Sequence, residues 1–255
     1  MPPSSASDQA IYDPAFVRDV FDRCSGKYIA FSTWLSFGFT ERWRAQCVEA
    51  LNLPAGPGVG YDFMAGTGEV WPHLLAARPE IEKIVAVDIS HGMHERAVRR
   101  LHAMRADYIE FIEDDVLASD LPEQSVDFVV STFGLKTFNP EQHRRLAALT
   151  ARVLKPGGRF AYIEASDPKG WWLRPLYLFH LKAFLPMIER ILLRGARDFA
   201  MIGTYSTNFG DASAFGEMLR EADLVVTFRK HFFGCATSVS GVKPALPTRG
   251  MRQES

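Results

Sequence analysis

Short apolar runs alternate with amphipathic stretches through most of the chain. Seven runs have the length of β-strands, and helical patterns follow the first, second and fourth of them, which is typical of parallel βαβ units. The first five runs are apolar through most of their length, as expected for strands covered by helices on both faces. The predicted strands are Val59–Met64, Lys83–Asp88, Tyr108–Ile112, Val126–Thr132, Arg159–Glu164, Leu224–His231 and Cys235–Val242.

The short link Phe232–Gly234 between the last two runs predicts an antiparallel hairpin at the sheet edge. The whole pattern predicts an α/β fold with a doubly wound, mixed seven-stranded sheet. Asn139 and Pro140 form an N-cap and first-turn signal, and Lys155–Gly158 predicts a turn before the fifth strand. The predicted helices are Glu69–Ala77, His91–Met104, Glu141–Leu154 and Asp211–Ala222, the last with Asp211 as its N-cap.

Two aromatic-rich regions, Ile11–Leu51 and Asp167–Gly210, lie outside this strand pattern. Because ligands of doubly wound sheets bind beyond the carboxyl ends of the strands, both regions could cover the site. We therefore expect one domain over residues 11–255, with a helical cap at 11–51 and a helical lid inserted at 167–210 between strands five and six. Residues 1–10, rich in Pro, Ser and Ala, predict a disordered tail.

The composition excludes several classes of protein. Of the 255 residues, 47% are hydrophobic and 23% charged, which is ordinary for a globular protein, and the net charge of −1 favours no nucleic-acid partner. The three cysteines form no CxxC pair, so we expect no metal site. We expect all three to be reduced, buried thiols. Without a secretory signal or a membrane-spanning run, we expect a cytoplasmic protein.

A glycine-containing loop, Asp62-Phe63-Met64-Ala65-Gly66-Thr67-Gly68, follows the first predicted strand and opens a helix. Gly66 and Gly68 allow a tight turn and close approach of a ligand to the backbone. Asp88 ends the second strand, where a carboxylate can accept hydrogen bonds from both ribose hydroxyls. Asp115 follows the third strand and can accept from an adenine amino group. Asp62 can meet the positive end of a bound amino acid.

These acidic residues favour S-adenosylmethionine (SAM) over a dinucleotide as the cofactor. The loop lacks the third glycine that packs against a pyrophosphate, and a carboxylate at Asp62 would repel one. A single aspartate at a strand end is a common cap. Acidic residues at three strand ends in this order are better explained by an adenosyl amino acid.

Several motifs resemble those of the ubiquinone/menaquinone biosynthesis C-methyltransferase family, from about Phe21 to Gly241. The resemblance implies a class I, Rossmann-like methyltransferase fold, with Met93 packed on the adenine and Thr132 lining the cofactor pocket. The motifs are Phe21–Tyr28 with Leu35–Gly38 and Trp43-Arg44, Asp62–Glu69, Val87–Ser90 with Gly92-Met93, Phe133–Lys136, and the generic Arg152–Gly158. The expected cofactor residues are Asp62, Met64, Ala65, Gly66, Gly68, Asp88, Ile89, Met93, Asp115, Val116 and Thr132.

The chain departs from the family pattern mainly on the substrate side. Met64 stands where the family has a small residue, and Lys136-Thr137 replaces an Arg-Asn pair after the fourth strand. The changed positions also include Ile29, Ser32 and Val239-Ser240. We therefore interpret the chain as a divergent member with a different substrate.

C-methylation of a ring requires a base that deprotonates the acceptor hydroxyl, whereas N- or O-methylation can proceed without one. Glu164 ends the fifth strand and is either a base or an anchor for the next loop. Lys136 could stabilise a phenolate or enolate. Tyr28 and His180 are further catalytic candidates, while His231 is expected to serve packing and His143 to be exposed.

The segment Trp171–Arg197 is rich in aromatic residues and cations. It predicts a lid over an apolar substrate first, a membrane-surface helix second and a homodimer face third. The favoured function is SAM-dependent methylation of a hydrophobic small molecule, such as a quinol, phenol, prenyl or aryl compound. The alternatives are a SAM-dependent enzyme that installs an amino group on a quinone, and a non-catalytic SAM-binding partner protein.

Overall fold

The computed structural model describes residues 10–36, 38–104, 107–184, 187 and 198–245. The predicted tail lies outside these residues except for Ala10, and so does most of the stretch from 185 to 197. Among the described residues, no helix is long and apolar enough to cross a membrane. All three cysteines are buried, free thiols, as predicted.

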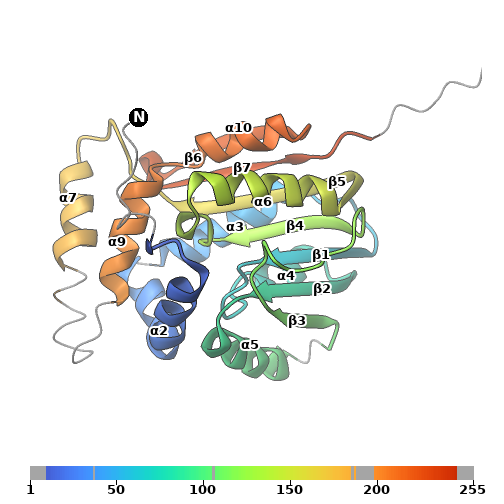
Figure 1. Cartoon of the computed structure of the whole chain (residues 1–255), viewed down its shortest axis with the longest axis horizontal. Helices are drawn as coiled ribbons and strands as arrows, with labels where there is room; N and C mark the ends of the chain where they lie inside the picture. The colour runs from blue at the N-terminus through green and yellow to red at the C-terminus, as the bar shows by residue number, and fades with distance from the viewer. Residues whose placement is uncertain (1–9, 37, 105–106, 185–186, 188–197, 246–255) are drawn as a thin grey trace, which may run out of the picture.

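A single sheet holds seven strands in the order β3-β2-β1-β4-β5-β7-β6 (Figure 1). Strands β1 to β5 are parallel, and β7 runs antiparallel between β5 and the edge strand β6. This confirms the predicted doubly wound mixed sheet with a closing hairpin. The strands are β1 (Gly58–Phe63), β2 (Ile81–Asp88), β3 (Ile109–Glu113), β4 (Val126–Thr132), β5 (Leu154–Ala165), β6 (Val225–His231) and β7 (Ala236–Val242).

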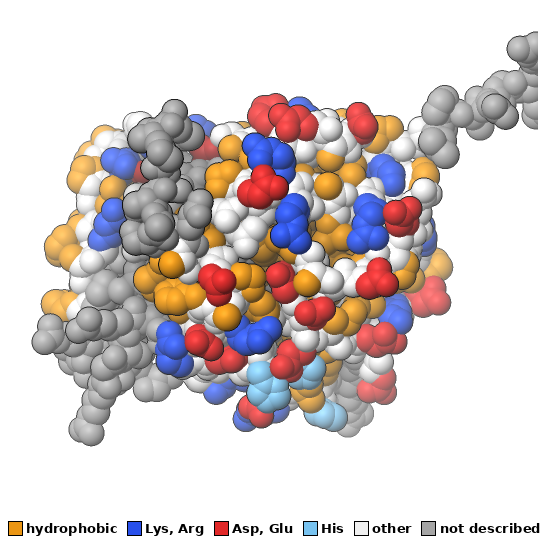
Figure 2. Space-filling model, viewed as in Figure 1, with side chains coloured by type: hydrophobic (Ala, Val, Ile, Leu, Met, Phe, Trp, Pro, Cys, Tyr) orange, Lys and Arg blue, Asp and Glu red, His pale blue; other side chains and the backbone are white. Residues whose placement is uncertain are grey.

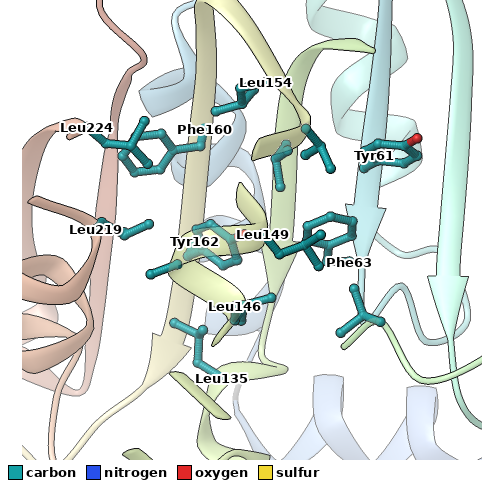
Figure 3. Close-up of a cluster of buried hydrophobic side chains, with 14 of the residues drawn as sticks. Tyr61, Phe63, Leu135, Leu146, Leu149, Leu154, Phe160, Tyr162, Leu219 and Leu224 are labelled. Carbon is teal, nitrogen blue, oxygen red and sulfur yellow. The ribbon is translucent and has the colours of Figure 1, made fainter. Parts of the chain in front are cut away.

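Helices cover both faces of the sheet because alternate strand residues point to opposite sides. Ile84 and Ala86 pack into one buried cluster with α3 and α4, whereas Val85 and Val87 join a second cluster with α6 and α10 (Figure 3). The helices are α2 (Pro14–Leu35), α3 (Phe39–Leu51), α4 (Trp71–Ala77), α5 (His91–Met104), α6 (Pro140–Val153), α7 (Arg174–Phe179), α9 (Asp198–Phe209) and α10 (Ser213–Glu221). Short helical turns are η1 (Leu135–Thr137), the π-helical η2 (His180–Phe184) and η3 (Phe232–Gly234).

Local capping signals were accurate in one helix and displaced in another. Asn139 caps α6 through a capping box in which its side chain accepts from Gln142 N and Gln142 Oε1 accepts from Asn139 N. Helix α10 begins at Ser213 instead of Asp211, because the Asp211 carboxylate accepts from Ser213 N and closes a turn before the helix.

The segment Lys155–Gly158, predicted as a turn before the strand, lies inside β5, which begins at Leu154. It is an irregular stretch of that strand, because Val126 pairs with Leu154 and Phe128 with Arg159, and Gly157 has a φ of 83°. Gly157 N donates to Lys243 O and Lys243 N donates to Gly158 O, both at 2.8 Å, so the residues just after β7 extend the ladder. Helix α4 starts later than predicted, at Trp71, because Glu69 still belongs to the preceding loop.

The two regions outside the strand pattern are helical where the structure describes them. Helices α2 and α3 precede β1, and α7, η2 and α9 lie between β5 and α10. Figure 1 places α7, α9 and α2 at one end of the sheet, where α9 packs against η2 and α2. Helix α2 and this insertion therefore gather at the carboxyl ends of the parallel strands, whereas α3 packs on a face of the sheet.

Candidate functional site

A pocket of about 810 Å³, counting its part open to solvent, lies beyond the carboxyl ends of β1 to β4. The chain order of the strands reverses between β1 and β4, which is the position where doubly wound folds bind ligands. The lining residues are Tyr12, Pro14, Val17, Phe21, Arg44, Met64, Ala65, Gly66, Glu69, Val87, Asp88, Ile89, Met93, Asp114, Asp115, Val116, Thr132, Phe133, Gly134, Thr137, Phe138 and Gln142. All the expected cofactor residues except Asp62 and Gly68 belong to this set.

The loop after β1 is held in a conformation that depends on its glycines. Gly66 and Gly68 have φ values of 58° and 74°, in the left-handed region that favours glycine. A Cβ atom on Gly68 would lie 2.3 Å from the ring of Trp71, so α4 also packs too closely for a side chain there. Gly68 thus allows the loop to pack against Trp71 on the side away from the pocket, whereas Gly66 lines the pocket.

Asp88 joins the loop to the end of β2. Its Oδ2 accepts from Gly66 N at 2.8 Å, and its Oδ1 accepts from Ser90 N at 2.9 Å. Each oxygen retains a lone pair, so the carboxylate can also accept from a pair of ribose hydroxyls. Burial, with the nearby Glu69 and Asp22 carboxylates, raises the pKa of Asp88 to about 6 although both amide bonds lower it.

Cofactor affinity should depend on pH through Asp88. Its raised pKa means that the carboxylate takes up a proton as the pH falls through about 6. A protonated carboxyl loses acceptor capacity, so affinity for S-adenosylhomocysteine (SAH) should be full above this pH and decline below it. Titration calorimetry between pH 5 and 8 checks this, because Asp88→Asn should remove the decline. A decline that persists in Asp88→Asn would assign it to another group.

The residues after β3 form the next part of the pocket. Asp114 accepts from Asp115 N and from the Ser119 hydroxyl, which folds the turn. Asp115 Oδ1 accepts from Leu117 N at 2.9 Å, and Oδ2 has no hydrogen-bond partner among the described residues. Asp115 therefore retains an acceptor for a ligand N–H, in the place expected for an adenine amino group.

Asp62 lies behind the pocket. It is buried, and its Oδ2 accepts from Trp71 Nε1 at 2.8 Å. Burial, with repulsion from Asp88 and Glu69, raises its pKa well above the ordinary range despite the Trp71 hydrogen bond. Asp62 thus fixes Trp71 beneath the loop, and its contact with the positive end of a bound amino acid stays a prediction.

The residues that follow β1 and β4 have unusual backbone conformations. Met64 and Phe133 have φ values of 52° and 66°, which cost energy for residues other than glycine. Gly134 makes room for Met64, since a Cβ atom on Gly134 would lie 2.5 Å from the Met64 Cβ. Such strained residues collect at functional sites, and both of these line the pocket.

Arg44 of α3 is a site residue that sequence reasoning missed. It is the one lysine or arginine among the described residues that line the pocket, and it is 2% exposed. Its Nη1 donates to Glu41, its guanidinium lies 5.2 Å from the Phe133 ring centroid, and its buried Nε has no partner among the described residues. The orphaned donor and the pocket fit the anionic end of SAM, which has a carboxylate beside its cationic centres.

Arg44→Met should therefore weaken binding of SAH by about tenfold, the value of one charge-assisted hydrogen bond. Decarboxylated SAM, which lacks the proposed partner of Arg44, should bind the wild type and the variant with similar affinity. Calorimetry with both ligands checks this prediction. An equal loss for both ligands would indicate that Arg44 only supports the fold.

Asp22 of α2 is a second missed residue, and it holds the turn after β2. Its Oδ1 accepts from the Ser90 hydroxyl at 2.6 Å and from Gly92 N at 2.9 Å. A Cβ atom on Gly92 would lie 2.7 Å from Ser25 Oγ, so α2 packs directly on this turn. The N-terminal region thereby orders the ribose side of the pocket. Asp22 lies within the family-like motif Phe21–Tyr28, but nothing in that motif indicates that its side chain bonds to Ser90 and Gly92.

Two predicted catalytic residues, Lys136 and Glu164, satisfy each other outside the pocket lining. Lys136 Nζ donates to Glu164 Oε1 at 2.8 Å and to Phe133 O at 2.6 Å, and the side chains are 5% and 0% exposed. Glu164 also accepts from Lys136 N and Ala165 N. The pair ties η1 to the end of β5, which supports the anchor role of Glu164 over the role of a base.

The other catalytic candidates are not among the described pocket-lining residues either. His180 stacks on Phe184 in η2, and Tyr28 lies on α2 with its side chain outside the described part. His143, expected to be exposed, is instead buried: its Nε2 bonds to Leu135 O, and burial lowers its pKa. His231 is buried against Ser238 Oγ, in agreement with a packing role.

The fold and pocket define a class I methyltransferase, and the sequence comparisons identify the family. The model of the ubiE/COQ5 methyltransferase family matches residues 7–243. The chain belongs to this family and is an enzyme that uses SAM as its methyl donor. Demethylmenaquinone methyltransferase of Bacillus cereus (strain B4264) is 25% identical over 229 residues, which cover 89% of this chain and 95% of the relative.

Solved structures support the same fold at low sequence identity. The methyltransferase bound to the Trm112 activator in Haloferax volcanii is 16% identical, with a TM-score of 0.60 and coverage of 88% of this chain and 97% of that one. Geranyl diphosphate C-methyltransferase of Streptomyces coelicolor A3(2), solved with SAH, is 11% identical, with a TM-score of 0.56 and coverage of 79% and 78%.

Proposed function

We propose that the enzyme methylates a hydrophobic ring compound of the quinol or phenol type, bearing a prenyl or aryl substituent, at carbon or oxygen. The observation that carries this proposal is the composition of the pocket outside the cofactor residues. The lining side chains contributed by α2, by the residues just before it and by the segment after β4 are mostly apolar. They include Tyr12, Val17, Phe21, Phe133 and Phe138.

The residues of the chain contribute mainly by positioning the acceptor. Bound SAM supplies a methyl group activated by its sulfonium. Aromatic walls hold the acceptor ring and exclude water, which places the attacking atom in line with the methyl carbon. The described lining residues include no histidine, but they include the Glu69 carboxylate. The proton lost by the acceptor therefore passes to solvent, to Glu69 acting as a base, to the Tyr12 phenol acting as a relay, or to a residue outside the described part.

Met64 is proposed to set acceptor selectivity. The family resemblance places a small residue here, and Met64 fills that space against Gly134 at the end of β1. Its sulfur-containing side chain narrows the pocket next to the loop that holds the methionyl end of the cofactor. This difference favours an acceptor distinct from demethylmenaquinone, the substrate in the name of the Bacillus relative.

A panel of acceptors tests the function. The enzyme should form SAH with prenylated benzoquinols or alkylated catechols, and more slowly with reduced short-prenyl naphthoquinones, and the product's methyl signal in NMR separates C- from O-methylation. Phosphoethanolamine serves as the small polar control. Methyl transfer to the polar acceptor alone would contradict the proposal.

A further inference from the structure

An apolar surface lies at the end of the molecule formed by α7, the residues before it and η3. We call it the docking face and define it by Trp172, Leu176, Phe179, Phe232 and Phe233. Trp172 and Phe233 are 81% and 67% exposed, which is unusual for such large apolar side chains. Leu176 and Phe179 have the spacing that places side chains on one side of α7, and Trp172 lies in the turn just before this helix.

The opposite side of α7 fixes this face to the body of the protein. Tyr177 is partly buried against the core, and its hydroxyl donates to Cys235 O at 3.3 Å. Arg174 makes two hydrogen bonds of 2.6 Å to Asp167. Trp171 stacks on Phe233 with ring centroids 5.3 Å apart and planes 2° apart. The exposed side chains therefore project from an ordered support.

Backbone strain holds two of the exposed rings at the surface. Phe232 and Phe233 are consecutive and have φ values of 41° and 57°. Left-handed conformations cost energy in bulky residues, and glycine or asparagine would close this hairpin with less strain. Phe232 packs on Phe39 and Phe233 on Trp171, but 45% of Phe232 and 67% of Phe233 stay exposed and available for a contact with another surface.

Cations outnumber acidic residues around the face, where Asp167 pairs with Arg174. Residues 168–184 and 224–235 contain no aspartate or glutamate, although the chain as a whole has a net charge of −1. Figure 2 shows hydrophobic side chains together with lysine or arginine along the edge that α7 forms in Figure 1. The cations of these two segments are Lys169, Arg174, Lys182, Arg229 and Lys230.

A row of aromatic rings connects the face with the pocket. Phe133 lines the pocket, and its ring centroid lies 6.4 Å from that of Trp43. Trp43 lies 5.6 Å from Phe39, and Phe39 lies 4.4 Å from Phe232 on the docking face. The face is thus continuous with the wall of the site.

We propose that the docking face binds the surface of a membrane that contains anionic lipids. Aromatic side chains that insert at the headgroup level, surrounded by lysines that attract anionic headgroups, are the combination that such a surface recognises. Lysines are depleted at the centres of protein–protein interfaces, which makes a second copy or another protein a poorer match. Docking would let an apolar acceptor enter the pocket from the bilayer. That consequence rests on the proposed function, whereas membrane binding itself does not.

Sedimentation with vesicles tests the proposal, using phosphatidylcholine alone and an equimolar mixture with phosphatidylglycerol. The full-length protein should sediment with the anionic vesicles, less so at high salt. Trp172→Ser/Phe233→Ser and Lys169→Glu/Lys182→Glu should each lower the partition coefficient by about tenfold or more. Val225→Ser, at the opposite end of β6, and Lys83→Glu/Arg144→Glu are matched controls that should bind like the wild type.

Titration with SAH checks that every variant is folded, and analytical ultracentrifugation reports association between copies. Equal binding by the docking-face variants and their controls would overturn the proposal. So would absence of vesicle binding, including the case in which the same variants abolish a dimer. Vesicle binding without methyl transfer to any apolar acceptor would support docking and count against the proposed substrate class, so the two failures are distinguishable.

Discussion

Asp88→Ala is expected to weaken binding of SAH by about a hundredfold or more. The carboxylate is placed to accept from two ribose hydroxyls, and hydrogen bonds to a charged group contribute about 1.5–3 kcal/mol each, of which every 1.4 kcal/mol is tenfold. The same substitution removes the acceptor of Gly66 N and Ser90 N, so the loop after β1 also loses its tie to β2.

Calorimetry with SAH measures this loss directly. Asp120→Ala is the matched control, because Asp120 is exposed after β3 and is not a lining residue. Asp88→Asn should fall between the wild type and Asp88→Ala, since one oxygen remains an acceptor. Equal affinities of Asp88→Ala and Asp120→Ala would contradict the ribose assignment.

Glu164→Leu is expected to lower the free energy of unfolding by about 3–5 kcal/mol. The substitution leaves the Lys136 ammonium buried with only the Phe133 carbonyl as a partner, and an unpaired buried charge is costly. The double variant Glu164→Leu/Lys136→Met should recover a large part of the loss, because no charge then remains. Urea denaturation of the wild type, both single variants and the double variant gives the coupling energy.

This cycle also decides between the two roles of the pair. If Lys136 and Glu164 serve as an anchor, the double variant should bind SAH and retain methyl transfer per folded molecule. If either takes part in chemistry, a folded double variant would bind SAH without transferring the methyl group. An unfolding free energy unchanged in Glu164→Leu would contradict the anchor role.

Elements with strong local signals agreed with the structure. The loop at Asp62–Gly68 lies between β1 and α4, and Asp88 ends β2 as its apolar run predicted. The capping box at Asn139 is contained within four residues and depends on no distant partner. Where a distant segment takes part, the local signal was incomplete: Gly157 and Gly158 bond with Lys243, so the predicted turn is an irregular stretch inside β5.

The candidate site was recognised only in part, because several contacts join residues far apart in the chain. Asp22 reaches Ser90 and Gly92 from α2, and Arg44 reaches the pocket from α3. A lysine after β4 and a glutamate at the end of β5 each suggest chemistry when considered alone. Their pairing across 28 residues gives them a different role, and no spacing pattern predicts it.

The sequence by itself determined the doubly wound sheet, the glycine-containing loop and the order of Asp88 and Asp115 at successive strand ends. These features follow from hydrophobic periodicity and turn chemistry, which act over a few residues. Only the tertiary structure decided that Arg44 enters the pocket, that Asp62 lies behind it and that Lys136 is neutralised by Glu164. Burial and ion pairing depend on how helices pack on the sheet, so they become visible only once the chain is folded.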